Sequence, residues 1–247
     1  MLECLLLSAA GRESNEGRWM YLMKRVGVAL LVVIAISVLA FRTFFPNYSY
    51  RYRLQLELEL DEKIYRGSSV IEVNWACGPK RTDAARCVAT IAGQAAAIDL
   101  GTRGILLATL RPGERNIPAS QLGVDAVFLC AEAFGNHSSD DELPALSRLT
   151  GRRKLSPENF PYLVWFPNPA NPKSVRKLTL GNISNAIDPT AHFTEAFVEI
   201  TADPIVIDIA TKLPWFPALL REQKGKLLIS PPTQLQLIYN MFVGEDS

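Results

Sequence analysis

The stretch YSYRYRLQLELELD, residues 48–61, alternates strictly between two kinds of side chain. Tyrosines and leucines occupy the even positions, and polar or charged residues occupy the odd ones. Because successive side chains of a β-strand point to opposite faces, this pattern predicts one long strand with an apolar face and a charged face. We expect the apolar face to lie in a core, which excludes a wholly solvated tether. The charged face begins with Arg51 and Arg53 and becomes acidic toward its end.

A second extended run follows this strand after a short turn. The turn is expected at Asp61-Glu62-Lys63 and the second strand at residues 64–75. Together they predict a long antiparallel hairpin, with Gly67 as a bulge or twist point. The first strand exceeds the usual length of about 3 to 10 residues, so we expect it to bend or to extend beyond its partner.

An uncharged segment, VGVALLVVIAISVLAF at residues 26–41, precedes the hairpin. As a helix it spans about 24 Å, slightly less than the roughly 30 Å of a bilayer's hydrocarbon layer. The flanking Lys24, Arg25 and Arg42 can extend their charges to the head groups. We therefore expect residues 23–45 to anchor the chain in a membrane.

Two other interpretations of this segment stay open. A cleaved secretory signal fits the basic residues before the apolar run and the small or β-branched residues at 38–40. A buried core helix is the third interpretation. With an anchor or a signal, residues 48–247 form an exported domain, and Lys24 and Arg25 favour a cytoplasmic N-terminus. Residues 1–22 are expected to be a disordered tail or a misread start.

The cysteines predict one disulfide. Cys77 and Cys87 are separated by GPKRTDAAR, a loop that can bring two strand ends within bonding distance. In an exported domain this pair is expected to be oxidised. No metal site is predicted, because there is no C-x-x-C pair and neither histidine lies at ligand spacing from a cysteine. Cys130 is expected to be a buried, small apolar residue.

The remaining patterns predict an α+β domain: a mainly antiparallel β-sheet with a few short packing helices, following the transmembrane helix. Helical spacing and a following Gly135 indicate a helix at residues 124–134. Trp215 and Phe216, set between two prolines, are interpreted as a wedge that closes the core, with an exposed docking or membrane-contact patch as the alternative. The other expected elements are a meander of strands at 86–92, 95–100 and 104–110, a short helix at 143–149, strands at 162–166 and 193–201, a strand or helix at 205–213, and a helix or strand near 233–242.

No catalytic set can be read from the sequence, and no cofactor is implied. His137 and His192 are interpreted as a loop residue and a structural residue, respectively. Glu57 and Glu59 would share one strand face about 7 Å apart, a spacing that a divalent ion or acid–base chemistry could use, although a solvated face has the same pattern. The net charge of +1 argues against a nucleic-acid partner.

Several stretches resemble a family of uncharacterised, membrane-anchored envelope proteins of Gram-negative bacteria. They are RYRLQLELELDEKIYRGSSVIEVNW, AIDLG, YLVWFPNPANPKSVRK and TADPIVIDIATKLPWF. The resemblance implies an exported α+β domain on an N-terminal anchor, and it carries no activity or site residues. We expect a single-pass inner-membrane protein with a cytoplasmic N-terminus and a periplasmic domain. The expected role is non-catalytic binding or scaffolding of an envelope component, and the alternative is an envelope hydrolase with a site assembled by the fold.

Overall fold

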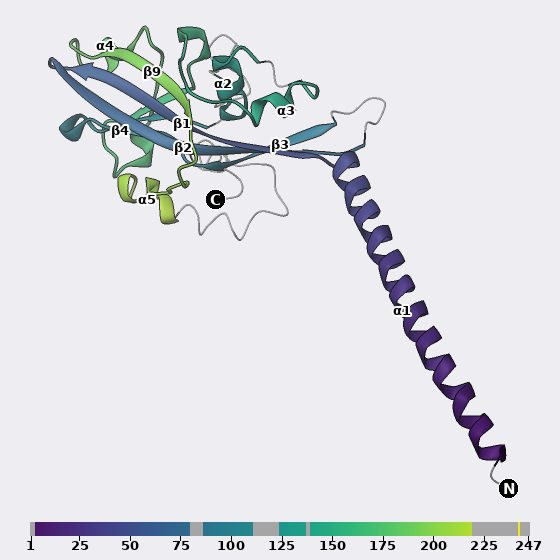
Figure 1. The fold of residues 1–247 in the computed structure, drawn as a ribbon. Coiled ribbons are helices and arrows are strands. Elements are labelled where there is room, and N and C mark those ends of the chain that lie inside the picture. The colour runs from purple at the N-terminus through teal and green to yellow at the C-terminus, as the bar shows by residue number, and fades with distance from the viewer. Residues whose placement is uncertain (1–2, 80–85, 111–123, 137–138, 219–241, 243–247) are drawn as a thin grey trace. The chain divides into compact units, whose positions relative to one another are not determined.

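The computed structural model (Figure 1) describes residues 3–79, 86–110, 124–136, 139–218 and 242. The predicted α+β class is confirmed: a long N-terminal helix precedes two antiparallel β-sheets and several short helices. The chain divides into two compact units, residues 1–46 with 77–84, and residues 47–76 with 85–247.

Helix α1 (Glu3–Phe44) contains an apolar stretch, Met23–Phe44, that is long enough to cross a membrane. Its 22 residues correspond to about 33 Å, so the flanking turns make up the length that residues 26–41 lack. None of this stretch is buried in the protein, which argues against the interpretation as a core helix. An exposed apolar helix near the N-terminus is consistent with a signal anchor or a signal peptide. Residues 3–22 belong to the same helix.

Strands β1 (Asn47–Leu60) and β2 (Lys63–Cys77) form the predicted hairpin, paired along their whole length. Asp61 and Glu62 both have positive φ, at 51° and 60°, as a two-residue type I′ hairpin turn requires. Of the two roles predicted for Gly67, a bulge in the hairpin is wrong, because the β1–β2 register has no shift; the twist point stays a prediction. The irregularity lies instead between β1 and β9, at Glu57 and Leu58.

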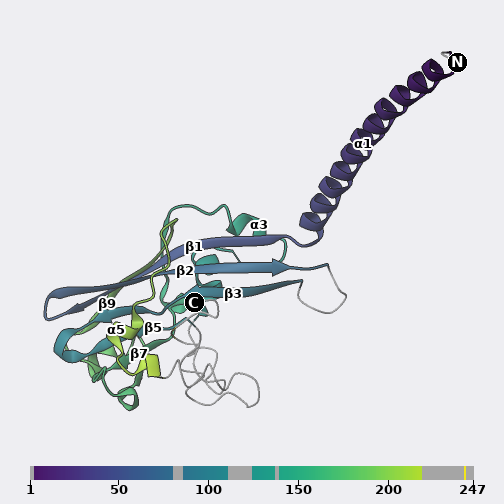
Figure 2. The same ribbon diagram turned by 90° about the horizontal axis from the view of Figure 1, so that it is seen from below.

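The first sheet has the strand order β3-β2-β1-β9-β6. It adds β3 (Cys87–Gly93), β6 (Arg152–Lys154) and β9 (His192–Ile200) to the hairpin, which places β1 at the centre. Figure 2 shows β1, β2 and β3 side by side. The alternation in β1 is confirmed, because every even-numbered side chain from Tyr50 to Leu60 is buried.

The second sheet has the order β4-β5-β7-β8. Its strands are β4 (Ala96–Asp99), β5 (Ile105–Ala108), β7 (Leu163–Phe166) and β8 (Arg176–Leu178). The predicted meander is therefore split between two sheets. The chain leaves the first sheet at Gly93, whose φ of +129° suits glycine and whose missing Cβ would lie 2.7 Å from the Val70 carbonyl oxygen.

Both faces of the second sheet are covered, since every residue of β5 and β7 is buried. On one face, Ile105, Leu107 and Val164 pack with residues that follow β9: Ile209, Leu213, Phe216 and Phe242. The interpretation of Trp215 and Phe216 as a core wedge is confirmed, because Phe216 is buried and the Trp215 indole N–H donates to the Pro169 carbonyl. On the other face, Ile98 meets Gly67 of the hairpin.

The short elements follow the sequence pattern in part. The helices are α2 (Ala126–Ala133), α3 (Leu143–Leu146), α4 (Ile183–Ala186) and α5 (Ile209–Lys212), and the 3₁₀ turns are η1 (Gly101–Arg103), η3 (Pro157–Asn159) and η4 (Pro172–Ser174). Helices α2 and α3 and strands β7 and β9 were predicted, whereas β6, β8 and α4 were not. Residues 233–241 lie outside the described part of the chain.

Two tyrosine hydroxyls attach α2 to the inner face of the first sheet. Tyr52 donates to the Ala126 carbonyl oxygen at 2.6 Å, and Tyr50 donates to the Val127 carbonyl oxygen at 3.2 Å. Burial raises the pKa of both hydroxyls, so they remain protonated donors across the physiological range. The buried phenol groups therefore fix the start of α2 on β1.

Replacing Tyr52 with phenylalanine is expected to lower the free energy of unfolding by about 1 to 2 kcal/mol. The ring would keep its packing, and the loss would come from one buried hydrogen bond. Urea denaturation of the full chain in detergent measures the change. Tyr65→Phe, a half-exposed tyrosine of β2, is the matched control. Equal stability of the two variants would contradict a role for the Tyr52 hydroxyl.

Candidate functional site

Basic residues lie at both ends of the apolar stretch of α1. Lys24 and Arg25 lie at its start and Arg42 lies in the last helical turn. All three side chains are exposed. The axial distance between Arg25 and Arg42 is about 26 Å, which suits long basic side chains reaching the two head-group layers.

Cys77 and Cys87 form the predicted disulfide. It joins the end of β2 to the start of β3, and both cysteines are buried. The Cys77 N–H also donates to the Pro46 carbonyl oxygen at 3.1 Å. A disulfide is typical of proteins in oxidising compartments and suggests an extracytoplasmic domain.

Cys130 is buried on α2 and is not disulfide-bonded, as predicted. Burial raises the pKa of its thiol to about 12. Because the thiolate is the reactive form, this cysteine is a packing residue and not a nucleophile at neutral pH.

The outer face of the first sheet carries charges that are paired between neighbouring strands. Arg51 of β1 binds Glu72 of β2, and Lys154 of β6 binds Glu195 of β9 at 2.7 Å. Arg53 binds Glu199 of β9 and Asp203 just beyond it. The basic-to-acidic gradient along β1 is therefore balanced by charges on the adjoining segments.

The carboxylates considered for metal or acid–base chemistry are engaged in this pairing. Glu57 accepts from Arg66 at 2.9 Å and from Gln55 at 3.1 Å, and the Arg66 hydrogen bond is the main reason that its pKa is lowered. Glu59 lies 3.3 Å from the exposed His192. Among the described residues, no group of three or more potential metal ligands gathers. His137 lies outside the described residues.

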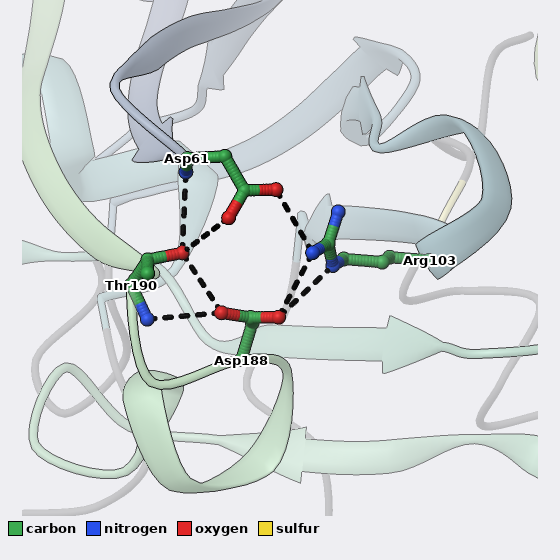
Figure 3. Close-up of polar contacts among 4 residues, drawn as sticks. All are labelled: Asp61, Arg103, Asp188 and Thr190. Carbon is green, nitrogen blue, oxygen red and sulfur yellow. Dashed lines mark hydrogen bonds and ion pairs between the residues drawn. The ribbon is translucent and has the colours of Figure 1, made fainter.

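Four residues converge at the tip of the hairpin (Figure 3): Asp61, Arg103, Asp188 and Thr190. We call this group the clasp. Asp61 belongs to the hairpin turn, Arg103 ends η1 before β5, and the other two lie between α4 and β9. The clasp thus joins three segments that are distant in the sequence.

The Arg103 guanidinium bridges the two carboxylates of the clasp. One nitrogen, Nη2, lies 2.9 Å from Asp61 and 2.9 Å from Asp188, and Nε lies 3.2 Å from Asp188. The Thr190 hydroxyl lies 2.8 Å from Asp188 Oδ1 and 2.9 Å from Asp61 Oδ1. It also accepts the Asp61 N–H at 3.2 Å.

Hydrogen bonds to its charged form lower the pKa of Asp188 to about 2. The donors are the Thr190 N–H at 3.0 Å, the Thr190 hydroxyl and the Arg103 guanidinium, with the backbone N–H first in importance. The same contact with Asp188 raises the pKa of Arg103. Asp188 and Arg103 therefore both stay charged at neutral pH.

The chemistry of the clasp is that of a structural junction. The Thr190 hydroxyl bridges the two carboxylates, and both carboxylates also bind Arg103, so the contacts of the clasp are directed at one another. In the sequence, only the Asp188-Pro189-Thr190 turn has a pattern that indicates one of these contacts, because an aspartate side chain often binds the backbone N–H two residues later. Nothing in the sequence around Asp61 or Arg103 indicates that these residues contact this turn.

Removing the Asp188 carboxylate is expected to destabilise the protein more near neutral pH than near pH 3. The folded pKa of about 2 lies below the ordinary 3.8, so the stabilisation is complete above 3.8 and is lost as pH falls through about 2. The difference in unfolding free energy between wild type and Asp188→Asn should shrink accordingly in urea titrations of the full chain in detergent. Asp141→Asn, in the exposed loop before α3, controls for net charge, and a pH-independent difference would contradict the prediction.

Comparisons with protein-family models, with curated proteins and with solved structures each found no match.

Proposed function

We propose that the chain is a single-pass inner-membrane protein of a Gram-negative bacterium with a periplasmic domain that binds or scaffolds an envelope component without catalysis. The observation that carries the proposal is an exposed apolar helix of membrane-spanning length that leads into a disulfide-bonded domain. The sequence resemblance to membrane-anchored envelope proteins supports the same location.

The ion pairs on the surface of the domain support binding or scaffolding more than catalysis. On the outer face of the first sheet and in the clasp, acidic and basic side chains bind each other. A carboxyl group that acts as a general acid at neutral pH needs a raised pKa, whereas the pKa of Asp188 is lowered to about 2 and that of Glu57 is also lowered. A rigid surface with fixed charges suits recognition of a partner.

Topology can be tested with a phosphatase reporter that is active only in the periplasm, fused after Ser247. We expect an active, membrane-bound fusion of full length. A shortened fusion that is released from the membrane would show that the apolar segment is a cleaved signal and not an anchor. An inactive fusion would overturn the proposed location.

The binding role can be tested by crosslinking in intact cells. A crosslinked product that depends on an intact outer face, and that is lost when Lys154 and Arg66 are reversed to glutamate, would support the proposal. Alanine variants of both positions are the matched controls for loss of charge alone. If crosslinking yields only products that these changes leave intact, the outer face is not the binding surface.

A further inference from the structure

The domain is joined to helix α1 by a short tether at the end where β1 begins. The helix ends at Phe44 and β1 begins at Asn47, so three peptide steps, at most about 11 Å, separate the two residues in any orientation. The head-group layer adds roughly 5 to 7 Å beyond the hydrocarbon on each side. If α1 is the anchor proposed above, the start of β1 therefore lies at the membrane surface.

Helix α2 brings an exposed aromatic side chain to the same end. Its first residues follow β1 toward the tether: Ala126 contacts Tyr52, and Val127 contacts Tyr50. The next residue, Phe128, has its ring centroid 6.2 Å from that of Trp75, which is paired with Tyr48. Phe128 is 42% exposed. Within the described residues of the domain from Asn47 onward, it is the one exposed Phe or Trp side chain.

A second exposed apolar residue lies at this end on β3. The disulfide holds Cys87 next to Cys77, whose backbone N–H binds Pro46, two residues after the end of α1. Val88 follows Cys87 directly, points to the opposite face of the sheet, and is 65% exposed. The sheet thus has an exposed apolar residue on each side near the tether.

We propose that Val88 and Phe128, which we call the apolar rim, insert into the head-group layer of the bilayer that holds α1. The inference rests on the proposed anchor. Aromatic side chains favour the membrane interface, and removing exposed apolar surface from water is favourable. The bilayer is the occupant that the short tether keeps within reach. The domain would then rest on the membrane through two contacts in addition to its tether.

Spin labels can measure the depth of the apolar rim in the full chain reconstituted into phosphatidylethanolamine and phosphatidylglycerol vesicles. Single cysteines at 88 and 128 are labelled in a Cys4→Ser background, where Cys130 is buried and Cys77 and Cys87 are bonded to each other. Ile64 is the matched control. It is 43% exposed and lies at the opposite end of the hairpin, about 40 Å along the strand.

The expected result is a higher ratio of oxygen to nickel-chelate accessibility at 88 and 128 than at 64. A label at Val33, in the middle of the apolar stretch, reports the anchor separately. If Val33 lies in the hydrocarbon and both rim labels match the aqueous value at 64, the rim proposal is overturned and the anchor stands. If Val33 is also aqueous, the anchor and the rim proposal both fail.

Discussion

Replacing Gly67 with alanine is expected to lower the free energy of unfolding by about 2 to 3 kcal/mol. A Cβ at this position would lie 2.2 Å from the Ala97 carbonyl oxygen and 2.8 Å from Ile98 Cγ1. The carbonyl belongs to β4, which is paired with β5 along its whole length, so it cannot retreat without loss of hydrogen bonds between strands. The hairpin and the second sheet would have to separate locally.

Gly181→Ala is the matched control for this substitution. Gly181 has open space around its Cβ position and no positive φ, so alanine there should leave stability unchanged or raise it slightly. Urea denaturation of both full-length variants in detergent, with the wild type, gives the comparison. If the Gly67 variant is as stable as the Gly181 variant, the two sheets lie farther apart than the 2.2 Å between an added Cβ and the Ala97 carbonyl oxygen implies.

Gly67 also illustrates what the sequence can predict. A glycine within an alternating strand indicates either a bulge or a close approach, and the local pattern does not distinguish them. The choice depends on Ala97, thirty residues later in another sheet. The alternation itself needed no such information, because one buried face and one solvated face are sufficient to produce it. The hairpin was therefore predicted correctly, and the role of its glycine was not.

The clasp could not be predicted for the same reason. Asp61, Arg103 and Asp188 come from three turns, and each has the composition of an ordinary solvated loop. Their meeting depends on how the second sheet packs beneath the hairpin. Short edge strands present a related difficulty, because three residues such as those of β6 and β8 show too little periodicity to recognise. The disulfide could be predicted from the sequence because the loop between its two cysteines is short.

Replacing Cys77 and Cys87 together with alanine is expected to lower the free energy of unfolding by about 2 to 3 kcal/mol. The two cysteines are ten positions apart, and closing a loop of this size removes that much chain entropy from the unfolded state. Alanine is chosen because both side chains are buried and a serine hydroxyl would add a separate desolvation penalty. The double variant measures the crosslink with the least disturbance to packing.

A reducing agent provides the internal control for this prediction. Dithiothreitol should lower the stability of the wild type to about that of the double variant and should leave the double variant unchanged. Cys4→Ser should keep the full response to the reductant, because its Cys77–Cys87 bond is intact. A double variant that is as stable as the oxidised wild type would mean that the loop is already ordered in the unfolded state. If the double variant is less stable and still responds to the reductant, a different pair of cysteines forms the bond.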